Sequence, residues 1–478
     1  MNNGSLGTKV LIVGAGVTGL AVARAVCGST TGRQATLADD SARPRPGGLD
    51  DGVAFVAPVT DWHALVTEAD LVVVSPGVTP QHPIFAAATD RAVELIGEIE
   101  FALRVWEERF GLDRTSMALV AVTGTNGKTT VTTLIDEMLR ASGVDSRPAG
   151  NIGTALIDVV SAPETTADTA VVLEASSFQL ATTARLAPRV AVITNIAADH
   201  YDWHADLADY AAAKARIVTG QSPDDLVVYP SEDSVVLGMV QESPAQRFGF
   251  SRRAGDVVGG PAAGVEWVDS DLLLDGTPVM TVDEIARQTP IDRVNLVAAG
   301  TAAWHMGGTV DGITQTAASF TGLAHRVALV AHVDQVRWID DSKATNPHAA
   351  VNAIATFDSV VLIAGGRNKG LDLGVLADEG SRIRALIGIG EASPEVEAVA
   401  AALGKPFRAA DSMDAAVKAA AALAKAGDTV LLSPACASFD WYRSYAERGN
   451  DFERAVQTWL LQPSPRGPEP GIASLEER

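Results

Sequence analysis

A glycine-rich segment that holds one lysine, GTNGKTT at residues 124–130, has the residue types of a phosphate-binding loop. The apolar run LVAV precedes it and helix-forming residues follow it, so the sequence predicts a strand, a loop and a helix. Backbone N–H groups of the loop can bind β- and γ-phosphate oxygens, Lys128 adds positive charge, and the Thr129 hydroxyl can ligate Mg²⁺. The usual phosphate-loop spacing is altered, because Val122 stands five residues before Gly127 where a glycine is normally found.

A second glycine-rich turn lies near the N-terminus, in KVLIVGAGVTGLAVARAV. Gly14, Gly16 and Gly19 have the G-x-G-x-x-G spacing between an expected strand and helix, and the next expected strand ends in Asp39. This is the dinucleotide-binding fingerprint, but the same turn can present its helix N-terminus to any diphosphate. The residues alone therefore leave open a nicotinamide-dependent dehydrogenase and other nucleotide-binding proteins.

Polar residues also follow two further apolar runs. Glu174 ends AVVLE, and Asn195, Asp199 and His200 follow VAVI. Because active groups of parallel α/β sheets gather where strands end, we expect these residues near one another. Lys214 in YAAAKARI lies on an expected helix among alanines, where a solvated surface lysine is the simplest interpretation.

Composition and charge narrow the classes of partner. The chain has 478 residues, 47% of them hydrophobic, and a formal net charge of -22. An acidic chain disfavours nucleic acid, and the absence of a basic leader or a long apolar run disfavours export and membrane insertion. We therefore expect a cytoplasmic protein that binds small molecules. A monomer is expected as well, although composition and charge do not indicate the oligomeric state. Cys27 and Cys436 are far apart, so we expect buried reduced thiols.

The order of expected strands and helices predicts an α/β protein with three domains. They are a Rossmann-like domain at residues 1–114, a central P-loop ATPase-like domain with a parallel sheet at 115–322, and a second Rossmann-like domain at 323–462. Residues 251–284 alternate in short runs and predict hairpins within the central domain. Residues 463–478 are rich in proline and glycine and predict a disordered tail.

Taken together, several segments resemble the Mur ligases, cytoplasmic enzymes of peptidoglycan synthesis. The matching segments are GTNGKTT, AGNIG, LEASSFQL, TNIAADHYDWH, YAAAKARI, AHR, DDSKATNP and LLSPACASFDWYRSYAERGNDF. SPGV, DDSKATN and SPACASFD are typical of the branch that adds D-glutamate, and the sequence lacks the DNPR motif of the diaminopimelate-adding branch. The resemblance implies ATP-dependent addition of D-glutamate to UDP-N-acetylmuramoyl-L-alanine through an acyl phosphate, with release of ADP and phosphate.

The resemblance also assigns roles to individual residues. The residues expected to act in catalysis are Lys128, Glu174, His200, Lys214 and Lys343. Those expected to bind ATP are Gly124, Thr125, Asn126, Gly127, Lys128, Thr129, Thr130, Asn295, Arg326 and Asp341. Those expected to bind the UDP substrate are Val17, Thr18, Asp39, Ser75, Pro76, Gly77, Asn151 and Ser176. Those expected to bind D-glutamate are Thr345, Lys369, Ser438, Phe439 and Tyr445.

Two Mg²⁺ ions are implied as well, with Thr129, Glu174, His200 and a carbamylated Lys214 at the metal site. Reaction with CO₂ needs a neutral amine, so Lys214 must be desolvated and have a lowered pKa. Asp40 departs from the family pattern, which often has a small hydroxyl residue at this position, and it leaves the contacts with uracil open.

Three alternatives to this function stay open on the sequence. The first is an NAD-dependent oxidoreductase, favoured by the N-terminal fingerprint and Asp39. The second is a non-catalytic, nucleotide-gated binding protein, which the presence of Lys128, Glu174, His200 and Lys343 argues against. The third is a Mur-type ligase that accepts a different amino acid. If the ligase interpretation holds, we expect the third domain to fold over the second, because the ATP-binding groups are divided between them.

Overall fold

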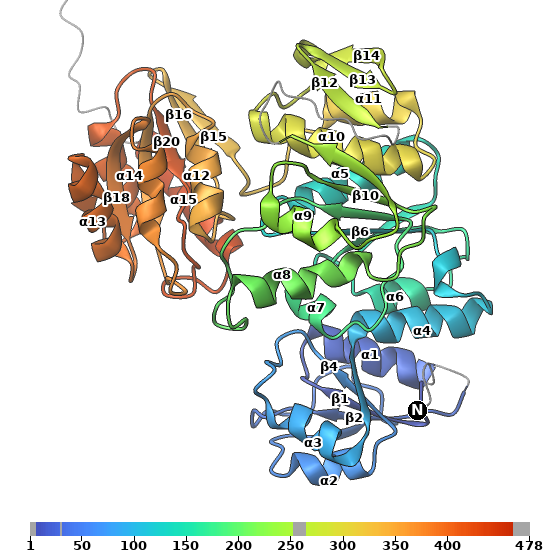
Figure 1. The fold of residues 1–478 in the computed structure, drawn as a ribbon. Coiled ribbons are helices and arrows are strands. Elements are labelled where there is room, and N and C mark those ends of the chain that lie inside the picture. Colours follow the sequence, from blue (N-terminus) through green and yellow to red (C-terminus); the bar gives the residue numbers. More distant parts are fainter. Residues whose placement is uncertain (1–5, 29–30, 252–263, 462–478) are drawn as a thin grey trace, which may run out of the picture. The chain divides into compact units, whose positions relative to one another are not determined.

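The computed structural model describes residues 6–28, 31–251 and 264–461. These residues divide into two compact units, Met1–Gly322 and Leu323–Arg478 (Figure 1). The expected tail at 463–478 and residues 252–263 of the expected hairpin region lie outside the described residues.

The N-terminal sheet is parallel and has the strand order β3–β2–β1–β4–β5. Its strands are β1 (Lys9–Val13), β2 (Gln34–Ala38), β3 (Ala54–Val56), β4 (Leu71–Val74) and β5 (Glu94–Gly97). Its helices are α1 (Val17–Gly28), α2 (Trp62–Thr67), α3 (Pro83–Arg91) and α4 (Glu98–Phe110). Val10–Val13 of β1 and all of β4 are apolar, because side chains on both faces of the sheet are buried there. The strand order reverses between β1 and β4, where open α/β sheets bind ligands.

The glycines of the first turn have a packing role. A Cβ on Gly19 would lie 1.9 Å from the carbonyl oxygen of Gly14. Only glycine therefore lets the start of α1 approach the end of β1 this closely.

The second sheet is also parallel and has the order β11–β10–β9–β6–β8–β7. Its strands are β6 (Leu119–Thr123), β7 (Ser146–Gly150), β8 (Ala170–Glu174), β9 (Val190–Ile193), β10 (Leu226–Pro230) and β11 (Gln246–Phe250). Its helices are α5 (Lys128–Ala141), α6 (Leu156–Ser161), α7 (Ser177–Ala181), α8 (Leu207–Ala215), α9 (Ser234–Val240), α10 (Pro290–His305) and α11 (Val310–Ser319). An antiparallel sheet follows, made of β12 (Val265–Val268), β13 (Asp271–Leu274) and β14 (Thr277–Thr281), so the expected hairpins are present in the described part of that region.

The segment that joins the first two sheets is fixed rather than loose. Arg114 in GLDRTS is buried and pairs with Glu100 of α4 at 3.0 Å and with Glu107 at 2.7 Å. Glu98, the first residue of α4, accepts the backbone N–H of Ile157 in α6 at 2.7 Å. These contacts explain why both sheets belong to one compact unit.

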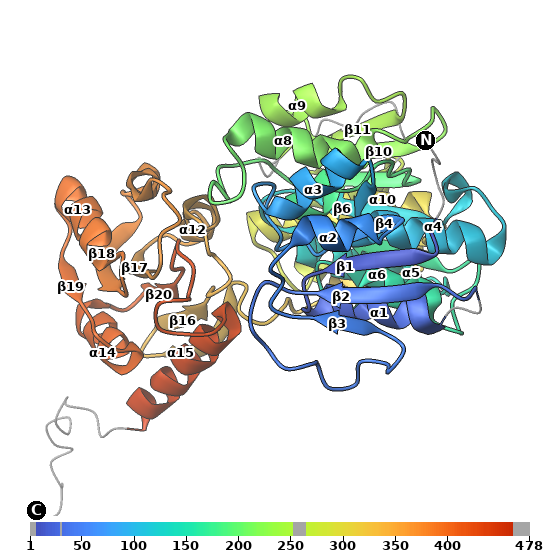
Figure 2. The ribbon, with the colours of Figure 1, turned by 90° about the horizontal axis from the view of Figure 1, so that it is seen from below.

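The second unit contains one six-stranded sheet with the order β15–β16–β20–β17–β18–β19, in which β15 alone is antiparallel to its neighbour. Figure 2 labels the other five strands of this sheet, from β16 to β19. Its strands are β15 (Ala328–Val333), β16 (Val336–Asp340), β17 (Val360–Gly365), β18 (Ile383–Ile389), β19 (Phe407–Ala409) and β20 (Thr429–Leu432). Its helices are α12 (Pro347–Ile354), α13 (Ser393–Leu403), α14 (Met413–Leu423) and α15 (Tyr445–Leu460).

Two smaller expectations can be compared with the structure. Cys436 is buried as expected, but Cys27 is half-buried on the face of α1, so the expectation of two buried thiols is wrong for Cys27. Within the described residues, no helix is both long enough and apolar enough to cross a bilayer.

Candidate active site

The glycine-rich loop between β6 and α5 is held in place by residues that follow β9. Asn195 accepts the N–H of Thr125 through its carbonyl at 2.8 Å, and its side-chain oxygen accepts the N–H of Asn126 at 3.0 Å. Gly124 has a φ of +142°, and a Cβ there would lie 1.9 Å from the Thr194 hydroxyl. A side chain at position 124 would collide with Thr194, so the loop needs glycine there. Thr194 and Asn195, which follow β9, pack against the loop.

The start of α5 has the features of an anion site. Gly127 is the N-cap residue of α5, and as a glycine it offers no side chain to cap the first N–H groups of the helix. The Nζ of Lys128 donates to the carbonyls of Gly124 at 2.9 Å and Thr125 at 2.8 Å, which folds the lysine back over the loop. The helix N-terminus and this ammonium group together attract negative oxygens.

Lys214 lies beneath this loop rather than at the surface. It is 1% exposed, and its Nζ donates to Gly124 O at 2.7 Å and to the Thr123 hydroxyl at 3.3 Å. Burial, and next the charge of Lys128, lower the pKa of Lys214 well below its ordinary value, although Asp199 and Glu174 oppose this shift. The surface interpretation of Lys214 is therefore wrong, and the desolvation that carbamylation requires is present.

Glu174, the last residue of β8, contributes a buried carboxylate with one unused oxygen. Its Oε1 accepts the side-chain N–H of Asn151 at 2.7 Å. Its Oε2 is buried and has no hydrogen-bond partner among the described residues. A buried carboxylate oxygen without a donor is costly by itself, so this atom suits a cation.

The two histidines of DHYDWH differ in burial and in the contacts that their rings make. His204 is buried and uses both ring nitrogens, at 2.9 Å from Asp209 Oδ2 and 2.9 Å from the Ser177 hydroxyl. The side chain of His200 is 32% exposed, and its ring rests edge-on against Phe178. His200 is therefore the better candidate for a metal ligand.

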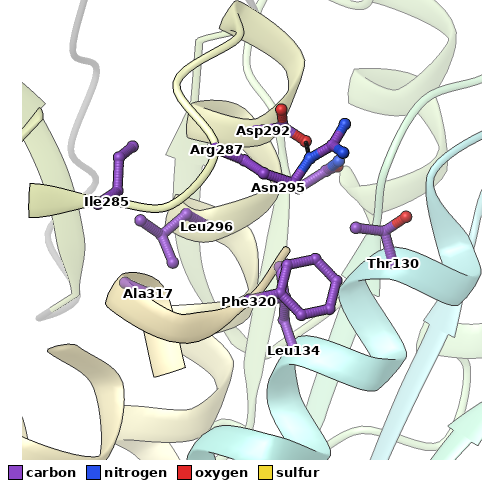
Figure 3. A pocket seen from close by; sticks show the side chains of 9 residues that line it. All are labelled: Thr130, Leu134, Ile285, Arg287, Asp292, Asn295, Leu296, Ala317 and Phe320. Carbon is purple, nitrogen blue, oxygen red and sulfur yellow. Dashed lines mark hydrogen bonds and ion pairs between the residues drawn. The ribbon is translucent and has the colours of Figure 1, made fainter. Parts of the chain in front are cut away.

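A small pocket adjoins the start of α5 (Figure 3). Its volume is about 20 Å³, and its lining residues are Thr130, Leu134, Ile285, Arg287, Asp292, Asn295, Leu296, Ala317 and Phe320. Asn295 of α10 faces the phosphate loop, because a Cβ on Gly127 would lie 3.2 Å from Asn295 Oδ1. An ion pair of 3.0 Å between Arg287 and Asp292 closes one side of the pocket.

A much larger cavity of about 730 Å³ lies at the point where the order of the first sheet reverses. Its lining includes the predicted substrate-binding residues Val17, Thr18, Asp39, Ser75, Pro76, Gly77 and Asn151. Lining residues from the second sheet region are Gly150, Asn151, Gly153 and Gln179. The cavity is therefore shared between the two sheets of this unit and lies next to the Asn151–Glu174 contact.

Two acidic residues of this cavity differ in role. Asp39 accepts the N–H groups of Ala15 and Ser41, each at 2.9 Å. Burial alone would raise the pKa of Asp39, but these donors and Arg43 lower it below the usual value. Asp39 therefore braces the glycine turn.

Asp40 lies at another part of the same lining. Its carboxylate contacts His82 Nε2 at 2.7 Å and accepts Trp62 Nε1–H at 3.2 Å. His82 Nδ1 accepts the N–H of Ile84, so the proton of a neutral His82 ring is on Nε2 and is donated to Asp40. Two ring N–H donors thus fix the Asp40 carboxylate.

Most predicted residues of the second unit lie in loops at the carboxyl ends of its strands, whereas Arg326 precedes β15 and Tyr445 is the first residue of α15. Asp341 follows β16, is buried, and accepts the Ser433 hydroxyl at 2.8 Å. Burial raises the pKa of Asp341 to about 7. The Nζ of Lys343 lies 4.1 Å from the centre of the Tyr445 ring. Ser438 is buried, whereas Phe439 is 62% exposed.

Family models match all three parts of the chain. The descriptions of these models are "Mur ligase MurD-like, N-terminal domain" at residues 8–97, "Mur ligase middle domain" at 122–272 and "Mur ligase, glutamate ligase domain" at 325–436. A relative from Frankia casuarinae, named UDP-N-acetylmuramoylalanine--D-glutamate ligase, is 40% identical over 94% of this chain and 94% of its own. This chain belongs to the Mur ligase family.

A second relative supports the family assignment, and solved structures of low sequence identity are similar in fold. A relative of the same name from Desulfosudis oleivorans is 39% identical to this Mur ligase over 94% of the chain and 96% of its own. The solved structure of UDP-N-acetylmuramate-alanine ligase from Thermotoga maritima is similar in fold, with a TM-score of 0.55 and 17% identity over 94% of this chain and 99% of that one. A pseudomurein peptide ligase type C from Methanothermus fervidus has a TM-score of 0.52 and 16% identity over 95% and 100%.

Ser176 differs in position from the other residues that were predicted to bind the UDP substrate. Ser176 is not among the described residues that line the large cavity, and it caps α7 instead. Its hydroxyl accepts the N–H of Gln179 at 3.3 Å, and the Gln179 side chain bonds back to the Ser176 N–H at 3.0 Å. Gln179 itself reaches the lining, so the capping box couples the two positions.

The sequence did not indicate several contacts that shape the sites of this Mur ligase. Asn195 was singled out for its place after a strand, but its two-sided contact with the phosphate loop was not foreseen. Tyr210 lies under Lys214, with Nζ 4.7 Å from the ring centre, and a helical i,i+4 spacing could have indicated the pair. His82 carried no motif signal, and Arg448 lies in the matching segment LLSPACASFDWYRSYAERGNDF but was assigned no role by the resemblance.

Proposed function

We propose that this Mur ligase joins D-glutamate to UDP-N-acetylmuramoyl-L-alanine at the expense of ATP, as a step of peptidoglycan precursor synthesis. The strongest support is the 35–40% identity to proteins named UDP-N-acetylmuramoylalanine--D-glutamate ligase, which extends over 94% of the chain for the relatives with the highest identity. The buried cluster beneath the phosphate loop fits this chemistry. An amide does not form spontaneously from a carboxylate in water, so the substrate carboxylate attacks the γ-phosphorus of ATP, ADP leaves, and the amine of D-glutamate then displaces phosphate from the acyl phosphate.

In this proposal, the phosphate loop and Lys128 bind the ATP phosphates. Transfer of a phosphoryl group between anions depends mainly on positioning and on positive charge placed before reaction. The N–H groups at the start of α5 and the ammonium group of Lys128 supply that charge from within one unit. Asn295 lies beside the loop, where it fits contact with the nucleotide, and Lys343, Asp341 and Arg326 complete ATP binding from the second unit.

The metal site of the proposal is formed by Glu174, Thr129 and His200. The unpartnered Oε2 of Glu174 and the partly exposed ring of His200 are the kinds of donor that divalent cations bind in this setting. Bound Mg²⁺ would neutralise phosphate oxygens and polarise the γ-phosphate, and we propose two such ions.

Lys214 is proposed to act as a carbamate. The neutral amine forms an N–C bond to CO₂ and loses one proton, which converts a cationic side chain into an anionic one. The buried, low-pKa amine next to Gly124 meets the requirement for a neutral nucleophile. The resulting carboxylate would add a second anionic ligand beside Glu174 and favour metal binding.

The large cavity of the first unit is proposed to bind the UDP part of the substrate. The N–H groups at the start of α1 face the diphosphate, and Asn151 orients the sugar end towards Glu174. D-glutamate is assigned to Thr345, Lys369, Ser438, Phe439 and Tyr445, with Lys369 as the counter-ion of a substrate carboxylate. We further propose a cytoplasmic monomer in which the two units close around the substrates.

A phosphate-release assay tests this function and its main alternatives. The enzyme receives ATP, Mg²⁺ and UDP-N-acetylmuramoyl-L-alanine, and phosphate is measured with D-glutamate, L-glutamate or L-lysine added. A strong response to D-glutamate alone is expected. A response to another amino acid would favour the different acceptor, and no response with any acceptor would contradict the ligase proposal. A nicotinamide-dependent change in absorbance would instead favour the oxidoreductase.

A further inference from the structure

Arg448 in α15 is a fully buried arginine. The proposed function, on which this inference rests, assigns it no role. It is 1% exposed and is among the largest fully buried side chains of the chain. Burial lowers the pKa of Arg448 to about 10, so the guanidinium still carries its charge at neutral pH. Asp440 and Asp340 act on this charge electrostatically, but within the described residues neither forms an ion pair with it.

The guanidinium donates hydrogen bonds to two loops that follow neighbouring parallel strands. Its Nε donates to the Ser342 hydroxyl at 3.0 Å and its Nη2 to the Ser342 carbonyl at 2.8 Å, in the loop after β16. Its Nη1 donates to the carbonyl of Cys436 at 3.1 Å, in the loop after β20. The planar fork of one arginine therefore fixes the spacing of both loops.

A third loop, after β17, rests directly on the same group. A Cβ on Gly366 would lie 3.1 Å from Arg448 Nη1 and 2.3 Å from the carbonyl of Ala437. Arg367 and Ala437 exchange backbone hydrogen bonds at 2.9 and 3.0 Å, which ties this loop to the one after β20. β16, β20 and β17 are neighbouring strands of the sheet. Arg448 therefore contacts three adjacent loops at the carboxyl ends of these strands.

These loops hold the residues assigned to D-glutamate and to the γ-phosphate. Lys343 and Thr345 belong to the loop after β16, Lys369 to the loop after β17, and Ser438 to the loop after β20. The start of α15 is tied in as well, because the Ser342 hydroxyl donates to the carbonyl of Tyr445 at 2.7 Å.

We propose that Arg448 is a positioning residue of the acceptor site: its buried guanidinium holds the loops after β16, β17 and β20 in the spacing that D-glutamate requires. Arg448 touches no substrate in this proposal and acts through Ser342, Cys436 and Gly366.

A role in folding alone accounts less well for this arrangement. The sheet is already held by strand pairing and by apolar clusters that include Ile339, Leu362 and Leu431 on one face. An apolar side chain of similar volume would fill the space without the cost of burying a charge. A charge without an ion-pair partner does suit a site that receives an anion, because the field of Arg448 then favours the substrate carboxylates.

The test compares Arg448→Lys and Arg448→Met with wild type in the full-length enzyme. Lysine keeps the charge but cannot form the planar fork, and methionine keeps much of the volume without charge. Arg454→Met is the matched control, because Arg454 lies on the same helix, is half-exposed, and pairs with Asp414 at 2.7 Å. KM and kcat are measured for D-glutamate and for the UDP substrate, together with the melting temperature.

We expect both Arg448 variants to raise KM for D-glutamate by at least about tenfold, since loop spacing controls binding of the acceptor. KM for the UDP substrate should stay within about twofold of wild type, since its cavity belongs to the other unit. Arg454→Met should resemble wild type. If Arg448 served folding only, a smaller active fraction would lower kcat and leave KM for D-glutamate unchanged, and that result would overturn the proposal.

Ser342→Ala decides the matter if neither Arg448 variant folds. This change removes the hydroxyl that accepts Arg448 Nε and donates to Tyr445, and leaves the charge in place. A higher KM for D-glutamate at an unchanged melting temperature supports the proposal, and an unchanged KM overturns it. A wild-type enzyme that releases phosphate with no amino acid would contradict the proposed function itself, which is a separate outcome.

Discussion

The amine of Lys214 donates a hydrogen bond of 2.7 Å to the carbonyl of Gly124, the first residue of the phosphate loop. This contact places a buried amine of lowered pKa against the loop, and the carboxylates of Asp199 and Glu174 act on its charge and partly oppose the shift. The residue composition of the segment YAAAKARI does not indicate that Lys214 is buried. The contact nevertheless makes Lys214 part of the phosphate site rather than of the protein surface.

The first prediction concerns this lysine. Lys214→Ala should lose most activity, and a short carboxylate such as acetate should restore part of it by taking the place of the carbamate. Wild-type enzyme in ¹³CO₂-enriched buffer should show a carbamate carbon signal by NMR that is missing from the variant. Lys418→Ala, at an exposed lysine of α14, is the control. Absence of both the signal and the rescue would argue against a carbamate.

The second prediction concerns the two lysines expected at the ATP phosphates. Lys128→Ala and Lys343→Ala should each reduce phosphate release by at least about a hundredfold, because each removes a positive charge on which phosphoryl transfer depends. Steady-state phosphate release at saturating substrates measures the effect, and Lys418→Ala should match wild type. Near-normal turnover of either variant would contradict the role proposed for that lysine.

The third prediction concerns Glu174 and the metal. Chelation of divalent cations should stop turnover, and added Mg²⁺ should restore it. Glu174→Gln keeps the shape of the side chain but removes the charge of the unpartnered Oε2, so the variant should need about tenfold or more Mg²⁺ for half-maximal activity. Glu164→Gln, at a partly exposed pair with Arg147, is the control. An unchanged Mg²⁺ requirement in Glu174→Gln would exclude Glu174 as a ligand.

The fourth prediction concerns pH and Glu98. Burial raises the pKa of Glu98 from 4.5 to about 7, with Asp158 adding to the shift and backbone N–H groups opposing it. Between these values the folded state holds more protons than the unfolded state, so stability falls as pH rises through this window. The loss is complete above about pH 7 and amounts to at most about 3 kcal/mol.

Urea unfolding of wild type and Glu98→Gln between pH 4 and 8 measures this contribution. The variant stays uncharged at this position, so its stability should decline less over the same range. Glu108→Gln, on the exposed side of the same helix, should keep the wild-type slope. Equal slopes for wild type and Glu98→Gln would show that Glu98 does not titrate in this window.

Much of the fold was predictable because its strands and loops follow from residue patterns that are local in the sequence. The apolar runs at β1, β6 and β8, each followed by glycine or a polar residue, predicted these strands correctly, although β6 extends one residue beyond the predicted run, to Thr123. The described residues divide into two compact units between Gly322 and Leu323, whereas the prediction of three domains placed boundaries before residues 115 and 323. The residues before α4 were less predictable: the sequence pattern predicted a helix near residues 96–110, but Ile96 belongs to β5 and α4 begins at Glu98. Pairing with β4 decided this position, and pairing is not visible in a local window.

The sequence by itself determined which segments could bind phosphate, since glycine spacing, a lysine and a following helix are local features of GTNGKTT and of the N-terminal turn. Only the tertiary structure decided that Lys214 is buried, that Glu174 keeps one oxygen unpaired, and that Arg448 lies beneath three loops. The reason is physical: burial, pKa and hydrogen-bond satisfaction depend on residues that are distant in the chain and meet only when the sheets form.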